Sequence, residues 1–209
     1  MPITSPTGVE HISLRGGRIC IDFVNTVDDR GTAHAVEYFT SYADVVAWGH
    51  HTGLVSEERA RRLLAEAERH PNQAHAVLTH VVTLREALYR TFLAAAEGAP
   101  AAAADVDAIN EALSHAMARA RLIPADDGYV WAWEEDDTAL DAPLWPVVRS
   151  AAELLTSAEL HRVHLCSSED CGWLFLDTSK NRSRRWCAME GCGNRAKARR
   201  HYQRTRAQL

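Results

Sequence analysis

The sequence contains no apolar run that approaches the roughly 20 residues needed to cross a bilayer. Its N-terminus, MPITSPTGVEHISLRGG, also lacks the apolar segment of a secretory signal. We therefore expect a cytoplasmic protein with no membrane partner. The 209 residues are 46% hydrophobic and 24% charged, which suits a globular chain with one sizeable core and a small additional module.

Motifs of common enzyme classes are also absent. The sequence has no Gly-x-Ser-x-Gly, no His-Glu-x-x-His, no phosphate-cradling glycine loop and no Gly-x-Gly-x-x-Gly. Histidines are frequent, but His75 and His80 lie five residues apart, a poor spacing for joint ligation from one helix face. We therefore expect neither an enzyme nor a second metal site.

Cysteine is scarce before residue 166 and then occurs four times, as two Cys-x4-Cys pairs separated by 15 residues. Zn²⁺ takes four sulfur ligands at about 2.3 Å in a tetrahedron, and the intervening stretch can form a hairpin that returns one pair to the other. We predict one structural Zn²⁺ held by Cys166, Cys171, Cys187 and Cys192. Two alternatives are disulfides, which need an oxidising compartment, and a redox dithiol, which usually has Cys-x2-Cys spacing. The fifth cysteine, Cys20, lies in an apolar run and is expected in the core.

Acidic residues nearly vanish from the last thirty positions. Residues 180–209 contain ten basic residues and one acidic residue, Glu190, for a net charge of +9. Because the whole chain carries −5, residues 1–179 carry −14. This asymmetry favours a polyanion partner, most often nucleic acid. A solvated surface, or docking of the basic segment on an acidic partner or on its own acidic body, is the alternative.

Residues 193–209 lack proline and, after the first position, glycine, so we predict a helix there. Ala198, Tyr202, Thr205 and Leu209 form one stripe, which we expect to pack against the finger or the body. Lys197, Arg200 and Arg204 lie roughly opposite and are available to phosphates. The predicted nucleic-acid contacts are Arg184, Arg185, Arg195, Lys197, Arg199, Arg200 and Arg204.

The N-terminal region predicts a hairpin of two strands, residues 10–14 and 18–24, joined by Gly16-Gly17. Asp22 falls inside the second strand and Asn25 at its end. These groups, with Arg30, define either a small-molecule pocket or internal bonds to nearby loop backbone. A small-molecule binding protein or enzyme using this pocket is therefore a further hypothesis.

The middle of the chain has the apolar spacing of helices, with proline and glycine at the breaks. Residues 128–133 alternate as a strand whose aromatic side chains, Tyr129, Trp131 and Trp133, are expected to pack against helices rather than to stack a ligand. Two further strands, 160–165 and 172–177, flank the first cysteine pair, and Trp173, Phe175 and Trp186 are expected to form a small core completed by the metal. The predicted helices cover about residues 42–52, 57–70, 73–97, 105–121 and 144–157.

The string Cys192-Gly193-Asn194-Arg195, preceded by Arg184-Arg185-Trp186-Cys187, resembles the CGNR zinc-finger family. Leu14-Arg15-Gly16-Gly17 and residues 20–27 resemble the ABATE domain that precedes this finger in regulators described as stress-induced. The resemblance implies ligation by the four cysteines and DNA contact from the finger. It indicates no effector and no catalytic residue.

The expected fold is therefore α+β: a mostly helical domain with a short antiparallel sheet, residues 1–158, followed by a small four-cysteine finger with a basic helix, residues 159–209. The body is expected to sense an effector of unknown identity or to form a homodimer, since one finger makes few phosphate contacts.

Overall fold

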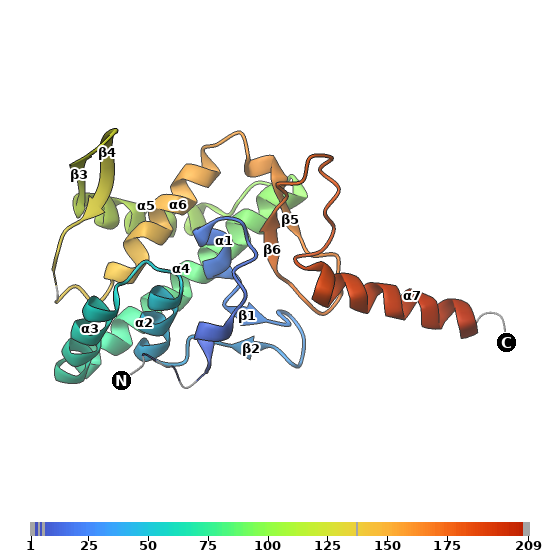
Figure 1. Cartoon of the computed structure of the whole chain (residues 1–209), viewed down its shortest axis with the longest axis horizontal. Helices are drawn as coiled ribbons and strands as arrows, with labels where there is room; N and C mark the ends of the chain where they lie inside the picture. The colour runs from blue at the N-terminus through green and yellow to red at the C-terminus, as the bar shows by residue number, and fades with distance from the viewer. Residues whose placement is uncertain (1–2, 4, 6, 137, 207–209) are drawn as a thin grey trace.

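Helices dominate the N-terminal three quarters of the protein, and short strands and loops form the remainder, from which one helix projects (Figure 1). The computed structural model describes residues 3, 5, 7–136 and 138–206, and the side chains of residues 200, 201 and 204 lie outside this description. Short antiparallel strand pairs and the cluster of four cysteines confirm the expected α+β class. No helix among the described residues is long and apolar enough to span a membrane.

The body is built from helices with well-defined starts. Ser41 begins α2 with a reciprocal capping box, in which Ser41 and Asp44 each bond the other's backbone N–H. Ser56 begins α3 by accepting a hydrogen bond from the backbone N–H of Arg59. These two caps fix the residues at which α2 and α3 begin. The body helices are α2 (Tyr42–His51), α3 (Glu57–Arg69), α4 (Pro71–Glu97), α5 (Ala103–Ala118) and α6 (Trp145–Leu155).

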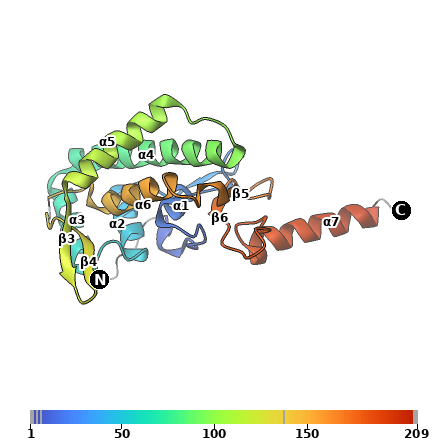
Figure 2. The same cartoon turned by 90° about the horizontal axis from the view of Figure 1, so that it is seen from above.

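Helix α4 is the central element of the body. Its buried residues Val81, Leu84, Leu88 and Phe92 recur at steps of three and four, which places them on one face. This helix contacts α2, α5 and the strand that precedes the first cysteine pair, and Figure 2 shows α4 and α5 running side by side. Because α4 is 27 residues long, it connects the far end of the body to the cysteine-containing segment.

The predicted N-terminal hairpin is wrong. Residues Val9–His11 form a 3-10 turn, and Ile19–Val24 form a short helix, α1. Every residue from Cys20 to Val24 is buried, and α1 contacts α4 and α6. An apolar run buried on all sides shows neither helical nor strand periodicity, so the sequence pattern could not distinguish the two structures. Cys20 is fully buried, as predicted for a core residue.

The strands form three separate antiparallel pairs rather than one sheet within the described residues. The predicted helix at residues 105–121 ends at Ala118, because residues 120–125 pair with the strand predicted at 128–133. The predicted strands at 160–165 and 172–177 are shorter than expected but pair with each other. The pairs are β1 (Val27–Asp28) with β2 (Val36–Glu37), β3 (Ala120–Ala125) with β4 (Gly128–Trp133), and β5 (Val163–Leu165) with β6 (Leu174–Leu176).

The β3–β4 hairpin stands at the end of the body opposite to the projecting helix (Figure 1). Tyr129 is 73% exposed and Trp131 is 43% exposed, although the guanidinium of Arg149 lies 4.7 Å from the Trp131 ring centre. Trp133 packs on α6, with its ring centre 6.1 Å from that of Trp145. The expectation that the row packs against helices therefore holds for Trp133 and, through Arg149 of α6, in part for Trp131, but not for Tyr129.

Candidate metal centre and nucleic-acid interface

The four cysteines of the C-terminal segment converge on one buried point. Cys166 directly follows β5, and Cys192 lies in a π-helical turn, Met189–Gly193, that leads into α7 (Asn194–Arg206). All four sulfur atoms lie within 4.8 Å of one another, and the Cys171–Cys187 and Cys187–Cys192 sulfur pairs are each 3.6 Å apart.

These distances fit a zinc tetrahedron. Sulfur ligands about 2.3 Å from a central ion lie about 3.8 Å from each other, close to the separations found here. A disulfide would require about 2.05 Å, and all five cysteines are free thiols. A fourfold thiolate set is the ligand chemistry of structural Zn²⁺, and no position is left open for substrate. Bound Zn²⁺ would supply rigidity rather than Lewis-acid catalysis.

The surroundings of the sulfurs favour the charged form of the site. The backbone N–H of Cys187 donates to the Cys166 sulfur at 3.4 Å, and the Arg195 guanidinium donates to the Cys192 sulfur at 3.2 Å. Four thiolates around Zn²⁺ carry a net charge of −2, which the cation of Arg195 partly offsets.

The cysteine-bearing segment docks on the body through buried backbone bonds. The Asn25 side chain, at the end of α1, donates to the Leu174 carbonyl at 2.8 Å and accepts from the Leu174 N–H at 2.9 Å. The indole of Trp173 donates to the carbonyl of Val27 at 3.1 Å. Leu174 and Phe175 are buried in the same core as the body helices. The expected small core of Trp173, Phe175 and Trp186 does form beside the cysteines, but it is continuous with the core of the body rather than separate from it.

Gly172 marks the closest approach of the two parts of the chain. Its φ is +70°, and a Cβ at this position would lie 2.6 Å from the Cβ of Arg30. Its carbonyl accepts a hydrogen bond from the Tyr89 hydroxyl at 3.0 Å, and the Arg30 guanidinium stacks 3.9 Å from the centre of that ring. Glycine is thus required twice, for its left-handed backbone and for its lack of a side chain.

Replacing Gly172 with alanine should lower the free energy of unfolding by about 2–3 kcal/mol, because both backbone strain and overlap with Arg30 oppose it. Gly53 is the matched control, since its φ is +74° but no atom of the described residues lies within 4 Å of the place that a Cβ would take. Gly53→Ala should cost only about 1 kcal/mol. Urea unfolding of both variants measures the difference, and equal losses would contradict a close contact at Gly172.

The three residues of the predicted small-molecule pocket are engaged within the protein. Asp22 accepts a hydrogen bond from the Gly16 backbone at 2.7 Å, and burial raises the pKa of Asp22 to about 6. Asn25 bonds the finger strand, and Arg30 pairs with Glu86 at 2.5 Å and donates to the carbonyl of Val24 at 3.0 Å. The geometry therefore favours the second interpretation of these groups, internal bonds that position the finger.

Arg184 holds the finger loop together. Its guanidinium donates to the backbone carbonyls of Trp186 and Cys187 in the loop and to that of Arg15 in the body. It also stacks 4.4 Å from the ring centre of Phe175. These contacts argue against a direct role in nucleic-acid binding. Residue types could not predict this role, because every residue has a backbone carbonyl and only the fold decides which carbonyls Arg184 meets.

Three other predicted arginines come together. Arg185, Arg195 and Arg199 line a hollow of about 250 Å³ between the first cysteine pair and α7, here called the arginine hollow. The neighbouring Ser167 and Ser168, which sequence reasoning did not single out, add hydroxyl groups to its wall. Arg199 also pairs with Glu169 and with Asp170, so part of its charge is neutralised locally.

Helix α7 differs from the prediction in one respect. Tyr202 is 62% exposed and Ala198 is exposed, so the stripe that was expected to pack against the finger or the body is open to solvent at these two positions. A helix that is polar almost all round is typical of a solvent-exposed rod. Lys197 is exposed, whereas the side chains of Arg200 and Arg204 and the whole of Leu209 lie outside the described residues.

These features define a helical protein with a four-thiolate zinc centre that holds the N-terminal end of a basic helix. Two protein-family models match the chain, the first over the body and the second over the finger. Residues 17–158 match the ABATE family, whose description is "Putative stress-induced transcription regulator", and residues 162–205 match the CGNR zinc finger. The chain belongs to the ABATE family and ends in a CGNR finger, and its four clustered cysteines form a single zinc site. No protein with a curated description matches it.

Proposed function

We propose that this protein is a non-enzymatic transcription regulator that contacts DNA through its zinc finger and α7. The projection of α7 is the observation that carries the proposal. The helix carries six basic residues and no acidic residue, and it extends away from the body in both views (Figures 1 and 2). A rigid cationic rod joined to a folded metal centre suits attraction to a phosphate backbone.

The charge pattern left docking of the basic segment on the acidic body as an alternative. Among the described side chains, the ion pairs of α7 are those of Arg199 with Glu169 and Asp170, both of which belong to the finger. Lys197 has no ion pair in this part of the chain and points to solvent. The arrangement therefore supports a helix with an open basic face.

The arginine hollow supplies a specific place for a phosphate. Arg185 and Arg195 can donate charge-assisted hydrogen bonds there, and Ser167 can add a hydroxyl donor. Glu169 also lines the hollow and already pairs with Arg199. One finger of this size meets few phosphates, so we propose that a homodimer provides useful affinity on DNA.

Replacing Arg185 and Lys197 together with alanine should weaken binding to a mixed-sequence DNA duplex about tenfold, because two phosphate contacts are lost. The slope of log K against log salt concentration should flatten by about 1.8, at about 0.9 per contact. Fluorescence anisotropy over a salt series measures both quantities. The wild-type protein should bind the same duplex only with zinc present, so a chelator should abolish binding.

The matched control removes two arginines from a body helix. Arg61 and Arg69 are exposed on α3, and alanine at both positions changes the net charge by the same amount. This control should leave the salt slope unchanged. If both variants bound DNA equally weakly, the change in net charge alone would explain the loss of affinity. That result would refute a DNA-binding surface on the finger. Binding of an acidic protein or single-stranded RNA in place of DNA would favour the alternative, an interaction module whose basic helix docks on another acidic partner.

A further inference from the structure

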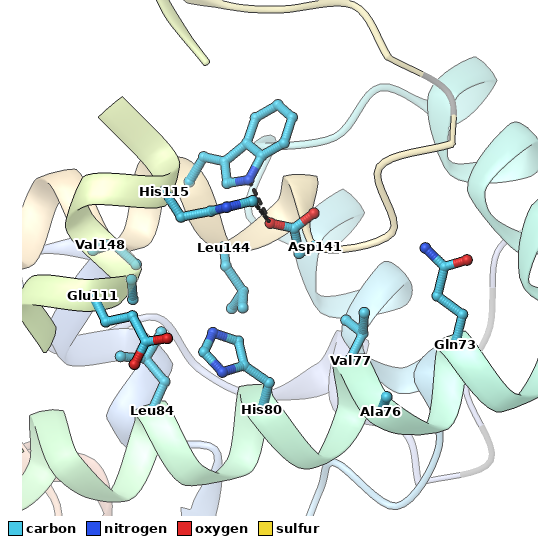
Figure 3. Close-up of a pocket in the computed structure, with 12 residues that line it drawn as sticks. Gln73, Ala76, Val77, His80, Leu84, Glu111, His115, Asp141, Leu144 and Val148 are labelled. Atoms are coloured by element: carbon cyan, nitrogen blue, oxygen red, sulfur yellow. Dashed lines mark hydrogen bonds and ion pairs between the residues drawn. The ribbon is translucent and has the colours of Figure 1, made fainter. Parts of the chain in front are cut away.

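A cavity of about 410 Å³ lies on the body, between α4, α5 and the start of α6 (Figure 3). Its floor is apolar and includes Leu84 of α4, Leu144 of the 3-10 turn Ala142–Leu144, and Val148 of α6, all buried. This volume falls in the range of small-molecule sites, at the lower end. We call it the α4–α5 groove.

Polar side chains converge on the rim of the groove. Figure 3 shows Glu111 of α5 and His80 of α4 reaching into it from facing helices, with Asp141 and His115 on a further side. Asp141 accepts a hydrogen bond from the Trp145 indole at 2.8 Å, and one of its oxygens lies 2.9 Å from His115 Nε2. Glu111 has no hydrogen bond or ion pair within the described residues, so its carboxylate is available to a ligand.

The charge of the groove is negative. Glu111 and Asp141 line it, and neither lysine nor arginine is among the described residues that line it. Two arginines contact the Trp145 ring but do not line the groove: Arg119 pairs with Asp136 at 3.3 Å, and Arg59 donates to the Glu134 carbonyl and keeps its positive charge. A cationic group at the rim would therefore meet carboxylate oxygens and a histidine ring nitrogen, while an anion would be repelled.

We propose that the α4–α5 groove binds a small organic monocation with a compact apolar body, such as a primary amine on an aromatic or branched aliphatic group. The apolar body covers Leu84, Leu144 and Val148, and the ammonium lies at the acidic rim beside Glu111. Nothing in this proposal depends on the finger. It goes beyond DNA binding and stands or falls separately from it, because the two tests use different residues.

The test uses 2-phenylethylamine and 3-methylbutylamine, with 2-phenylethanol as a neutral probe of similar size to the aromatic amine. In amide chemical-shift titrations of the full chain, both amines should produce saturable shifts confined to α4, α5 and residues 141–148, with dissociation constants below about 1 mM. The alcohol should bind at least about fivefold more weakly, the size of one solvent-exposed ion pair.

Two substitutions locate the site. Glu111→Gln should weaken both amines about fivefold and leave the alcohol unchanged, whereas Asp107→Asn, an equal charge change on α5 outside the groove, should affect neither. Ala76 lines the groove from an exposed position on α4, so Ala76→Trp should fill it with little effect on folding and abolish binding of all three probes. Thermal unfolding confirms that each variant is folded.

Three results would overturn the proposal. The first is that neither amine saturates below about 10 mM. The second is that the alcohol binds as tightly as 2-phenylethylamine. The third is that the amines bind Glu111→Gln or Ala76→Trp as tightly as the original chain.

Discussion

Replacing Cys187 with serine should abolish binding of one equivalent of zinc and unfold the finger loops. Cys187 lies 3.6 Å from the sulfurs of both Cys171 and Cys192, so its loss opens the centre of the ligand set. Structural zinc contributes about 10 kcal/mol or more to the folding of small fingers, the largest single stabilising term expected for this segment. Metal analysis of the purified variant measures the first effect.

The unfolding should be local. Strand β6 is buried against the body, whereas residues 177–193 depend mainly on the metal and on the bonds of Arg184. Hydrogen exchange should therefore rise at 177–193 and in α7, while the amides of α2 and α4 keep their protection. A chelator added to the original chain should reproduce this pattern.

Cys20 provides the matched control because it is the one cysteine outside the cluster. Cys20→Ala should keep one equivalent of zinc and unchanged exchange in the finger, at a modest cost in body stability from the lost sulfur. If Cys187→Ser retained full zinc and native protection at residues 177–193, the proposed ligand set would have to be abandoned.

Replacing Asn25 with leucine should destabilise the whole chain by about 4 kcal/mol, because two buried backbone groups of Leu174 lose their partners at about 1–3 kcal/mol each. Asn25 is itself 2% exposed, so water cannot restore those bonds. Leucine has a similar volume, which limits the contribution of a cavity. Chemical unfolding followed by tryptophan fluorescence and by circular dichroism measures the loss.

The same substitution at an exposed position is the control. Asn110 lies on the surface of α5, and Asn110→Leu should change the free energy of unfolding by less than about 0.5 kcal/mol. We also expect Asn25→Leu to loosen the finger at metal saturation, since the bond to Leu174 joins the two parts. A loss of less than about 1 kcal/mol in the free energy of unfolding of Asn25→Leu would show that Asn25 does not hold the finger to the body.

The metal ligands could be predicted because their chemistry is local in sequence. Four residues separate the two cysteines within each pair, and a tetrahedral zinc ion accepts only a few residue types as ligands. Spacing and residue identity together therefore restrict which residues can bind the metal. The helices from Tyr42 to Glu97 were also predictable, since serine caps and apolar spacing are written in consecutive residues. The nearby α1 was not, because its run of buried residues has no polar face.

The functional surface was predicted only in part. Residue type identified Arg184 and Arg185 as equal candidates, yet one bonds backbone carbonyls and the other lines the arginine hollow. No sequence pattern separates them, because the carbonyls that Arg184 meets belong to positions as distant as Arg15. The α4–α5 groove could not be predicted from the sequence either, because its lining residues lie up to 75 positions apart.

The sequence by itself determined the zinc ligands, the helical character of the body and the opposite charges of body and tail. These properties follow from residue identity and short-range spacing. Only the tertiary structure decided that the finger shares the core of the body through Asn25 and Gly172, that α7 projects away from the body, and which arginines remain available. Those outcomes depend on contacts between residues far apart in the chain, where packing and backbone hydrogen bonds select one arrangement among many with the same local pattern.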